Sequence, residues 1–156
     1  MRLDFRNLKD RAIIDSHYSN PGSAPGLGSE LVTNGDFSSG TGTDADDWTE
    51  GTGTTRVDAG GGSYVMRFAA TIDNTTQVNV FLGQPHGTYR VSFTISNYSA
   101  GTFRVRAGGI ATTAQGANGT YTEDISFAGA NNSVVLDAYT GPFSGDVDNV
   151  SVKQVL

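Results

Sequence analysis

The 156-residue sequence contains no cysteine, only one tryptophan (Trp48), and no long apolar run. Without cysteine there can be no disulfide framework, thiolate metal site or cysteine nucleophile. No apolar stretch approaches the roughly 18 residues of a membrane-spanning helix. The charged N-terminus also lacks the apolar segment of a secretory signal peptide. We therefore expect neither a membrane partner nor signal-directed export.

Residues that could support catalysis are few and scattered. His17 and His86 are the two histidines, and neither lies beside a nucleophile motif or a third partner. Asp44, Asp46 and Asp47 are close together, but they follow a Gly/Thr-rich stretch that is typical of a solvated loop. No glycine-rich loop opens a helix, so a phosphate cradle is not predicted. We expect a protein without enzymatic activity.

What the sequence does contain is glycine, at 21 positions, and short alternating segments. The clearest is Tyr89–Ser96, where every second residue is apolar, as in a strand with one buried face. Similar patterns predict strands at 56–58, 63–69, 77–82, 102–107, 121–127, 133–139 and 147–155. In the 77–82 segment, Val78, Val80 and Leu82 are expected on one face. Spacing of roughly 10 residues without helical periodicity indicates an all-β antiparallel sandwich or barrel, of jelly-roll or immunoglobulin-like type.

Turn chemistry supports the same interpretation. Asn118-Gly119 has the residues of a type I′ hairpin, and Gly60-Gly61-Gly62 is expected to form a loop. Val147 and Val150 cannot share a face under strict alternation, so a β-bulge is predicted near Asp148-Asn149.

The N-terminal region differs from the rest of the chain. Residues 1–28 form a predicted extended arm with a Pro/Gly linker at 20–28, and residues 29–156 form the predicted sandwich. Either the arm is a disordered tail, or it orders against a neighbouring subunit, which is the interpretation we favour. Its candidate partner-binding residues are Arg2, Leu3, Phe5, Arg6, Leu8, Arg11, Ile13 and Ile14.

Charge is unevenly distributed between these two regions. The arm has four basic and three acidic side chains, whereas residues 29–156 have six basic and thirteen acidic ones, a balance of −7. An acidic body disfavours nucleic acid and anionic membranes as partners. Solubility alone is the simpler explanation of this charge.

Oxygen-bearing side chains gather in two segments, Leu31–Phe37 and Phe143–Val152, which we expect to pair as the first and last parts of the sandwich. Asn34, Asp36, Asp146, Asp148 and Asn149 could then surround one Ca²⁺ ion, which takes six to eight oxygen ligands. The alternative is that these residues only make local turn and bulge contacts.

Exposed aromatic side chains would be needed to bind sugars. Tyr98 and Tyr139 fall near strand ends, where a binding site formed by loops would lie, and are the candidate glycan-binding residues. The alternative is that both belong to the core, as most aromatic residues in small sandwiches do.

Five segments in order carry a resemblance to a known family: 31–37, 47–51, 87–96, 118–124 and 148–152. Together they resemble the carbohydrate-binding-module-like jelly roll, above all copies found in structural proteins of tailed phages. The resemblance implies an internal position for Trp48 and a structural calcium held by Asp36 and Asp148. The lack of a second tryptophan departs from the sugar-binding members.

The resemblance implies a function at the virion. We expect a non-enzymatic capsid decoration (cement) protein on the outer capsid surface, with the tail as the alternative location. Its partner would be the major capsid protein or another virion protein, and it would assemble as a homotrimer with exchanged arms. Two other functions remain open: a glycan-binding receptor-recognition or tail-fibre module, and a secreted sugar-binding module.

Overall fold

The computed structural model describes residues 24–129 and 131–156, all of which lie in strands, turns and loops. The predicted arm residues between Arg2 and Ile14 lie outside this part of the chain. No helix within the described residues is long and apolar enough to cross a membrane. The strands are β1 (Leu27–Glu30), β2 (Gly40–Thr41), β3 (Asp44–Ala45), β4 (Thr54–Gly60), β5 (Ser63–Thr71), β6 (Thr75–Gln77), β7 (Gly87–Ala107), β8 (Ile110–Ala111), β9 (Gly119–Phe127) and β10 (Val134–Val155).

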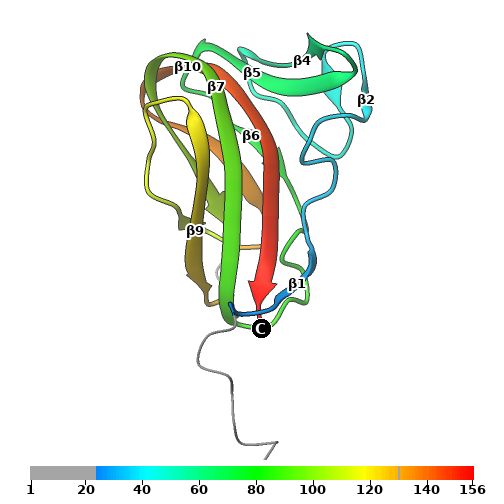
Figure 1. Ribbon diagram of the computed structural model, residues 1–156, viewed down its shortest axis with the longest axis vertical. Coiled ribbons are helices and arrows are strands. Elements are labelled where there is room, and N and C mark those ends of the chain that lie inside the picture. Colours follow the sequence, from blue (N-terminus) through cyan, green and yellow to red (C-terminus); the bar gives the residue numbers. More distant parts are fainter. Residues whose placement is uncertain (1–23, 130) are drawn as a thin grey trace, which may run out of the picture.

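Two long antiparallel strands, β7 and β10, form the centre of the fold and pass through both of its layers (Figure 1). We call the layer made by β9, β7 (87–96), β10 (146–155), β5, β4 and β1 the front sheet. The rear sheet consists of β6, the 134–138 part of β10, the 102–107 part of β7, and β8. This arrangement confirms the predicted all-β antiparallel jelly-roll sandwich.

The two long strands change layer at the same level of the molecule. The β7–β10 register shifts repeatedly between Ala138 and Asp146, and Gly101 and Gly141 both have positive φ angles there. A Cβ at Gly101 would lie 2.6 Å from the carbonyl oxygen of Pro142, so the close approach of the strands requires glycine. The predicted strands at 89–96 and 102–107 are therefore two parts of β7, and those at 133–139 and 147–155 are two parts of β10.

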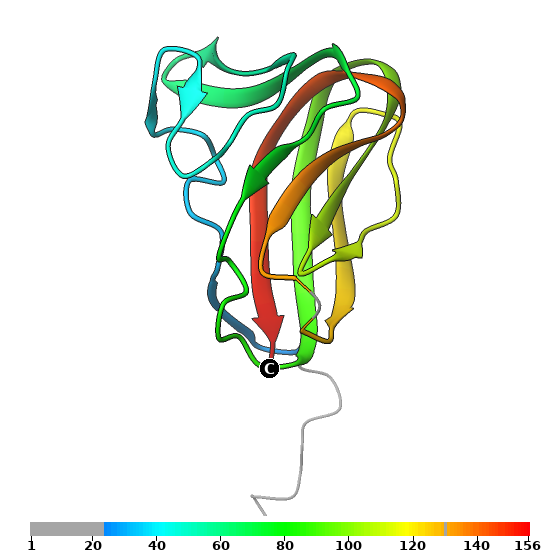
Figure 2. The ribbon, with the colours of Figure 1, turned by 180° about the vertical axis from the view of Figure 1, so that it is seen from behind.

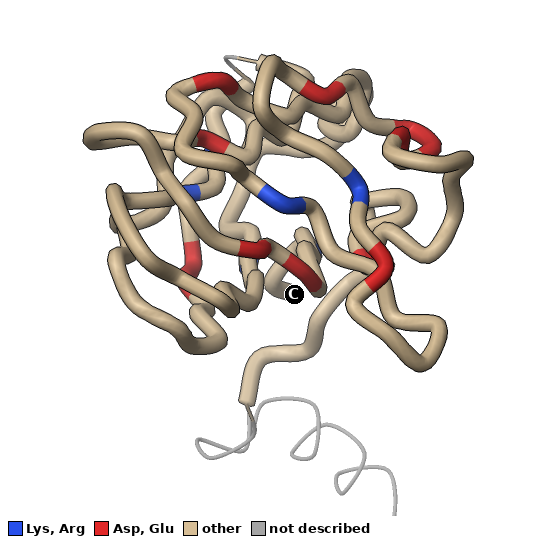
Figure 3. The backbone as a smooth tube through the Cα atoms, turned by 90° about the horizontal axis from the view of Figure 1, so that it is seen from above, with Lys and Arg blue, Asp and Glu red and all other residues tan. Residues whose placement is uncertain are grey.

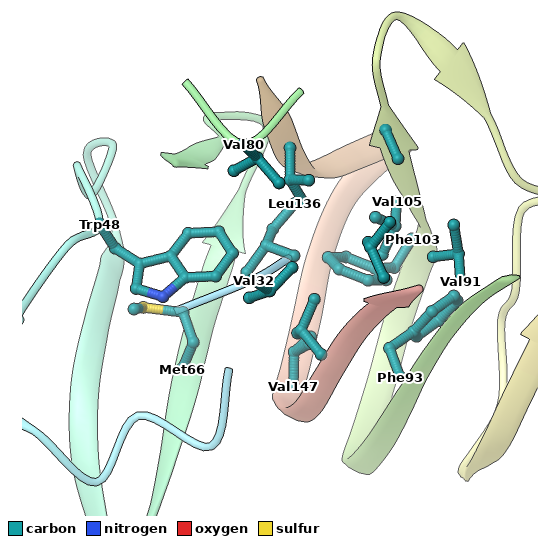
Figure 4. Close-up of a cluster of buried hydrophobic side chains, with 14 of the residues drawn as sticks. Val32, Trp48, Met66, Val80, Val91, Phe93, Phe103, Val105, Leu136 and Val147 are labelled. Atoms are coloured by element: carbon teal, nitrogen blue, oxygen red, sulfur yellow. The ribbon is translucent and has the colours of Figure 1, made fainter. Parts of the chain in front are cut away.

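The core lies between the sheets and follows the predicted alternation (Figure 4). Tyr89, Val91, Phe93 and Ile95 are at most 2% exposed, as are Phe103, Val105 and Ala107. Trp48 is buried against Phe37, with ring centroids 5.6 Å apart, and its Nε1 donates to the carbonyl of Asn34. Its internal position agrees with the resemblance and removes Trp48 as a sugar platform.

Two local predictions are wrong. β6 ends at Gln77 and Asn79 has a φ of 62°, so Val78 and Leu82 are exposed while Val80 is buried. Asn118 and Gly119 do not have the positive φ angles of a type I′ turn. Gly119 instead begins β9, and the Asn118 side chain accepts a hydrogen bond from the backbone N–H of Tyr98. At 77–82 the strand stops where its pairing with β10 ends, and at Asn118 a contact distant in sequence outweighs the local turn preference.

Candidate functional site

A polar pocket of about 330 Å³ lies where the first and last segments of the sandwich meet. Asp36 and Asp148, the two predicted metal ligands, both line it. The other lining residues are Ser38, Gly61, Gly62, Ser63, Tyr64 and Asn149. We call this cavity the acidic pocket.

Backbone pairing brings the two carboxylates together. The N–H of Val150 donates to the carbonyl of Gly35 over 2.8 Å, and that of Leu31 donates to Val152 over 3.0 Å. A Cβ at Gly35 would lie 2.0 Å from the Val150 carbonyl oxygen, so a side chain there would separate the two segments. The predicted pairing of the first and last segments is thus confirmed, although the strand itself, β1, ends at Glu30.

The predicted bulge fixes the direction of the second carboxylate. The β7–β10 register shifts between Asp148 and Ser151, and Asn149 has a φ of 54°. Asp148 accepts a 2.6 Å hydrogen bond from the Asn149 backbone N–H, while Asp36 accepts from the N–H and hydroxyl of Ser38. Each carboxylate therefore accepts hydrogen bonds from residues one or two positions away in the sequence.

The first wall of the pocket is positioned by a residue that the sequence did not single out. Arg56 is 6% exposed, and its guanidinium donates to the carbonyl oxygens of Phe37 and Ser38 at 2.6 and 2.9 Å. The same guanidinium lies 3.5 Å above the ring of Tyr64, another lining residue. Arg56 thus connects the loop that contains Asp36 to the β4–β5 hairpin.

The electrostatics of the pocket suit a cation. Burial raises the pKa of Asp148, the hydrogen bond from Asn149 acts against this, and the negative charge of Asp36 raises it further. A cation between the two carboxylates would remove the repulsion between them. Acidic residues are spread over the described backbone, whereas basic ones are fewer (Figure 3).

A calcium ion would need oxygen atoms beyond these two residues. Within residues 24–129 and 131–156, no three His, Cys, Asp or Glu side chains come close enough together to hold a metal. The pocket also contains the oxygen-bearing side chains of Ser38, Ser63, Tyr64 and Asn149, and Ca²⁺ accepts hydroxyl, amide and carbonyl oxygens. These side chains offer oxygen atoms of the kind that a hard cation takes as ligands.

Two of the five oxygen-bearing residues grouped by the sequence lie outside this pocket. Asp146 accepts hydrogen bonds from Arg67 at 2.7 and 2.8 Å and from Asn97 at 2.7 Å. The Asn34 side chain bridges the backbone of Ser39 and Asp46 instead. Their oxygens are therefore committed to structural contacts, which corrects the expectation of a shared ion.

The two candidate glycan-binding tyrosines have different surroundings. Tyr98 is half-buried; its hydroxyl donates to the Gly101 carbonyl, and its ring packs against the core at 6.3 Å from the Phe143 centroid. Tyr139 is 51% exposed, and the Arg104 guanidinium lies 3.5 Å from its ring centroid. Neither lines the acidic pocket.

A second pocket, of about 490 Å³, was not anticipated from the sequence. It lies where the backbone between Glu30 and Thr33 passes the segment that follows β6. Val78, which is 65% exposed, lines it together with polar side chains such as Gln77 and Gln84. No sequence signal marked this pocket, because the 77–82 segment was expected to be a regular strand.

Comparison with known proteins finds similarity in fold. No protein-family model and no curated protein matches the chain. The chain is similar to the solved structure of CBM35 from Paenibacillus barcinonensis, with 20% identity and a TM-score of 0.42, covering 65% of this chain and 92% of that one. The similarity concerns the carbohydrate-binding-module-like jelly roll alone.

Proposed function

We propose that this chain is a non-enzymatic structural protein of a phage particle, namely a capsid decoration protein. It would bind the outer shell through its N-terminal arm and the base of its sandwich. One observation of the structure carries the proposal: the described chain begins beside its C-terminus, where apolar side chains are left exposed. Leu27 is 41% and Leu156 is 74% exposed, and the N–H of Leu156 donates to the Gly26 carbonyl.

β1 and the C-terminus lie at the same end of the sandwich (Figure 1), so the arm, which precedes β1 in the sequence, would extend from that end. The arm has five large apolar side chains between Leu3 and Ile14 and a slight positive charge, whereas the body is acidic. An apolar, weakly basic segment is suited to burial against another protein, while the acidic sandwich would remain in solvent. The virion, the capsid partner and the homotrimer all follow from the resemblance.

The test is reconstitution on particles that lack the protein. We expect a chain without residues 1–23 to fold, because it keeps β1 and its pairing with β10, and to lose binding to the particle. The matched control keeps the full arm length but replaces its large apolar side chains by serine, at Leu3, Phe5, Leu8, Ile13 and Ile14. Occupancy and location would be measured by electron microscopy, and oligomeric state by light scattering. Full occupancy by the truncated chain would overturn the proposal.

A second candidate function, glycan recognition, is favoured by the exposed ring of Tyr139. A tyrosine that is 51% exposed, with a guanidinium against one face of its ring, can offer the other face to a sugar. Tyr98 lacks such a face because it packs on the core. The intact chain should bind at least one saccharide on a glycan array, and Tyr139→Ala should lose that binding while Tyr98→Phe retains it. An array without any bound saccharide would exclude this function.

We also propose that the acidic pocket holds a structural calcium ion between Asp36 and Asp148. The ion would connect the loop at 34–37 to the bulge in β10 and so fasten the first segment to the last. Its role would be stability, since both carboxylates already accept hydrogen bonds from the local backbone.

A further inference from the structure

The outer surface of the rear sheet is not covered by any other part of the described chain (Figure 2). Among the residues of its four strand segments, the charged ones are Arg104 and Arg106 of β7 and Asp137 of β10. Register places Asp137 directly opposite Arg104, and Arg106 opposite Val135. The inner-facing neighbours Phe103, Val105, Leu136 and Ala138 belong to the core, so all three charges lie on the outer face.

Tyr139 follows Asp137 on this face, and the Arg104 guanidinium packs against one face of its ring. Asp137 is 7% exposed and accepts a 2.7 Å hydrogen bond from Nε of Arg104. The Arg104 guanidinium in turn lies 3.5 Å from the Tyr139 ring centroid. The Arg104 side chain is only 21% exposed. A buried carboxylate thus fixes a guanidinium, and the guanidinium supports one face of the ring. Despite this contact, Tyr139 remains 51% exposed.

Arg106 leaves this face with a surplus of positive charge. Its Nε lies 3.5 Å from Oδ2 of Asp137, the same oxygen that Arg104 contacts. That Nε is buried and has no hydrogen-bond partner among the described residues, while the side chain is 41% exposed. On the front sheet, by contrast, Arg67 and Arg90 each make a two-pronged pair with a carboxylate of their own. Two arginines share one carboxylate only on the rear face of the described chain.

We propose that this face binds an acidic saccharide chain, with Tyr139 stacking on a sugar ring and Arg106 binding a carboxylate or sulfate group. The inference rests on the glycan-recognition function proposed above and names its ligand class and its site. Alternate residues on one strand are about 7 Å apart. Tyr139 and Arg106 lie on opposite sides of the Arg104–Asp137 row, so the ligand would run along the strands.

The composition of the face favours a saccharide over a protein partner. Protein interfaces have an apolar centre with several large side chains. Among the strand residues of this face, Tyr139 is the one exposed large hydrophobic residue; Val135 is 9% exposed. A single flat ring beside a guanidinium matches a sugar ring with an anionic substituent, because guanidinium groups bind planar oxyanions through paired hydrogen bonds.

The experiment compares matched pairs of oligosaccharides by calorimetry. Oligogalacturonate and its methyl ester differ in the carboxylate charge, while a carrageenan oligosaccharide and its desulfated form differ in sulfate. We expect an acidic member to bind at least about tenfold more tightly than its neutral partner, and its binding to weaken as NaCl rises. Whichever pair shows the difference identifies the anionic group.

Variants of the chain then locate the site. Arg106→Gln should weaken acidic-ligand binding by about tenfold and reduce its salt dependence. Tyr139→Ala should weaken binding to both members of a pair, with Tyr139→Leu as a second variant that keeps apolar bulk. Arg90→Gln, on the front sheet, is the matched control and should leave binding unchanged. Melting curves would verify that each variant is folded.

The outcomes separate the inference from the function on which it rests. Equal binding of acidic and neutral members, lost in Tyr139→Ala but unchanged in Arg106→Gln, would keep glycan recognition and overturn the acidic ligand. Binding that neither variant alters would overturn the site. No binding of any of the four oligosaccharides would overturn the inference, whereas a glycan array that also binds nothing would remove glycan recognition as well.

Discussion

Asp146 and Asp148 lie two residues apart on β10, yet their surroundings have opposite electrostatic effects. Burial raises the pKa of Asp146, but hydrogen bonds from Arg67 and Asn97 and the charge of Arg67 outweigh it, so that this pKa lies below its ordinary value. Burial also raises the pKa of Asp148, but there the neighbouring carboxylate of Asp36 acts in the same direction. One carboxylate is neutralised within the fold, and the other is not.

The contrast teaches that the role of an acidic residue depends on which chain segment passes beside it. Arg67 reaches Asp146 from β5, which pairs with β10 in register at that position. Asp148 lies beyond the last paired residue of β5 and meets the loop at Asp36 instead. We therefore assign structural stability to Asp146, while cation binding by Asp148 is the proposal that the following experiments test.

The strongest test of this assignment is Asp146→Ala. Asp146 is 2% exposed, and its removal leaves Arg67 and Asn97 without their acceptor. Since 44% of the Arg67 side chain is exposed and can be hydrated, we expect a loss of about 2–3 kcal/mol in the free energy of unfolding. Urea unfolding at neutral pH would measure it. A loss as small as that of an exposed ion pair would contradict the structural role.

The pH dependence of stability separates the two residues by sign. A lowered native pKa means that Asp146 contributes stability above the unfolded-state value of about 3.9 and loses it as pH falls through the native pKa. A raised native pKa means that Asp148 costs stability at neutral pH, and that this cost is relieved as pH falls through its native pKa. Unfolding measured against pH should therefore show a shallower acid-side decline in Asp146→Ala and a steeper one in Asp148→Asn.

Calcium should have the next largest effect. At tenfold excess over its dissociation constant, a ligand that binds the native state alone adds about 1.4 kcal/mol. We expect CaCl₂ to raise the melting temperature, a chelator to reverse the rise, and Asp36→Asn or Asp148→Asn to abolish it. An unchanged melt, or a rise that persists in both variants, would refute the calcium site and leave Asp148 without an assigned ligand.

Without calcium, Asp148→Asn should make the protein slightly more stable. The substitution removes a partly buried charge and its repulsion with Asp36, for a gain below about 1 kcal/mol. Differential scanning calorimetry in the presence of a chelator would measure the gain. Destabilisation under those conditions would mean that the carboxylate makes contacts stronger than its hydrogen bond from Asn149.

The smallest effect is expected for Asp124→Asn, which completes the comparison. Asp124 pairs with Arg90 at 2.7 and 2.8 Å, the same geometry as the Arg67–Asp146 pair. Both partners are partly exposed, however, at 39% and 31%, so water replaces the lost interaction. The shift in urea midpoint should be a small fraction of that for Asp146→Ala. Equal shifts would show that burial is not the deciding factor.

Much of the fold was predictable because strand patterns are local. The alternation from Tyr89 to Ile95, the bulge at Asp148-Asn149 and the turn at Gly60–Gly62 all depend on neighbouring residues. The bending of β7 and β10 through both sheets was not predictable, because it depends on how two strands pair across the molecule. The error at Val78 and Leu82 has the same origin: their alternation was regular, but the pairing ends at Gln77.

The candidate site was predictable in part. The meeting of Asp36 with Asp148 followed from the expected pairing of the first and last segments, whereas the separation of Asp146 did not. Arg104 and Arg106 alternate with buried residues in the sequence, which indicates an outward direction for both. Their sharing of Asp137 could not be read from the sequence, since it requires the β7–β10 register.

The sequence by itself determined the all-β class, the buried face of the central strands and the pairing of the first and last segments. These depend on side-chain alternation and turn residues, which act over a few positions. Only the tertiary structure decided which carboxylates have cationic partners. Arg67 and Asp146 are 79 residues apart, and Arg104 and Asp137 are 33 apart. Charge neutralisation acts through space at a few ångströms, so it is settled by strand register and not by position in the sequence.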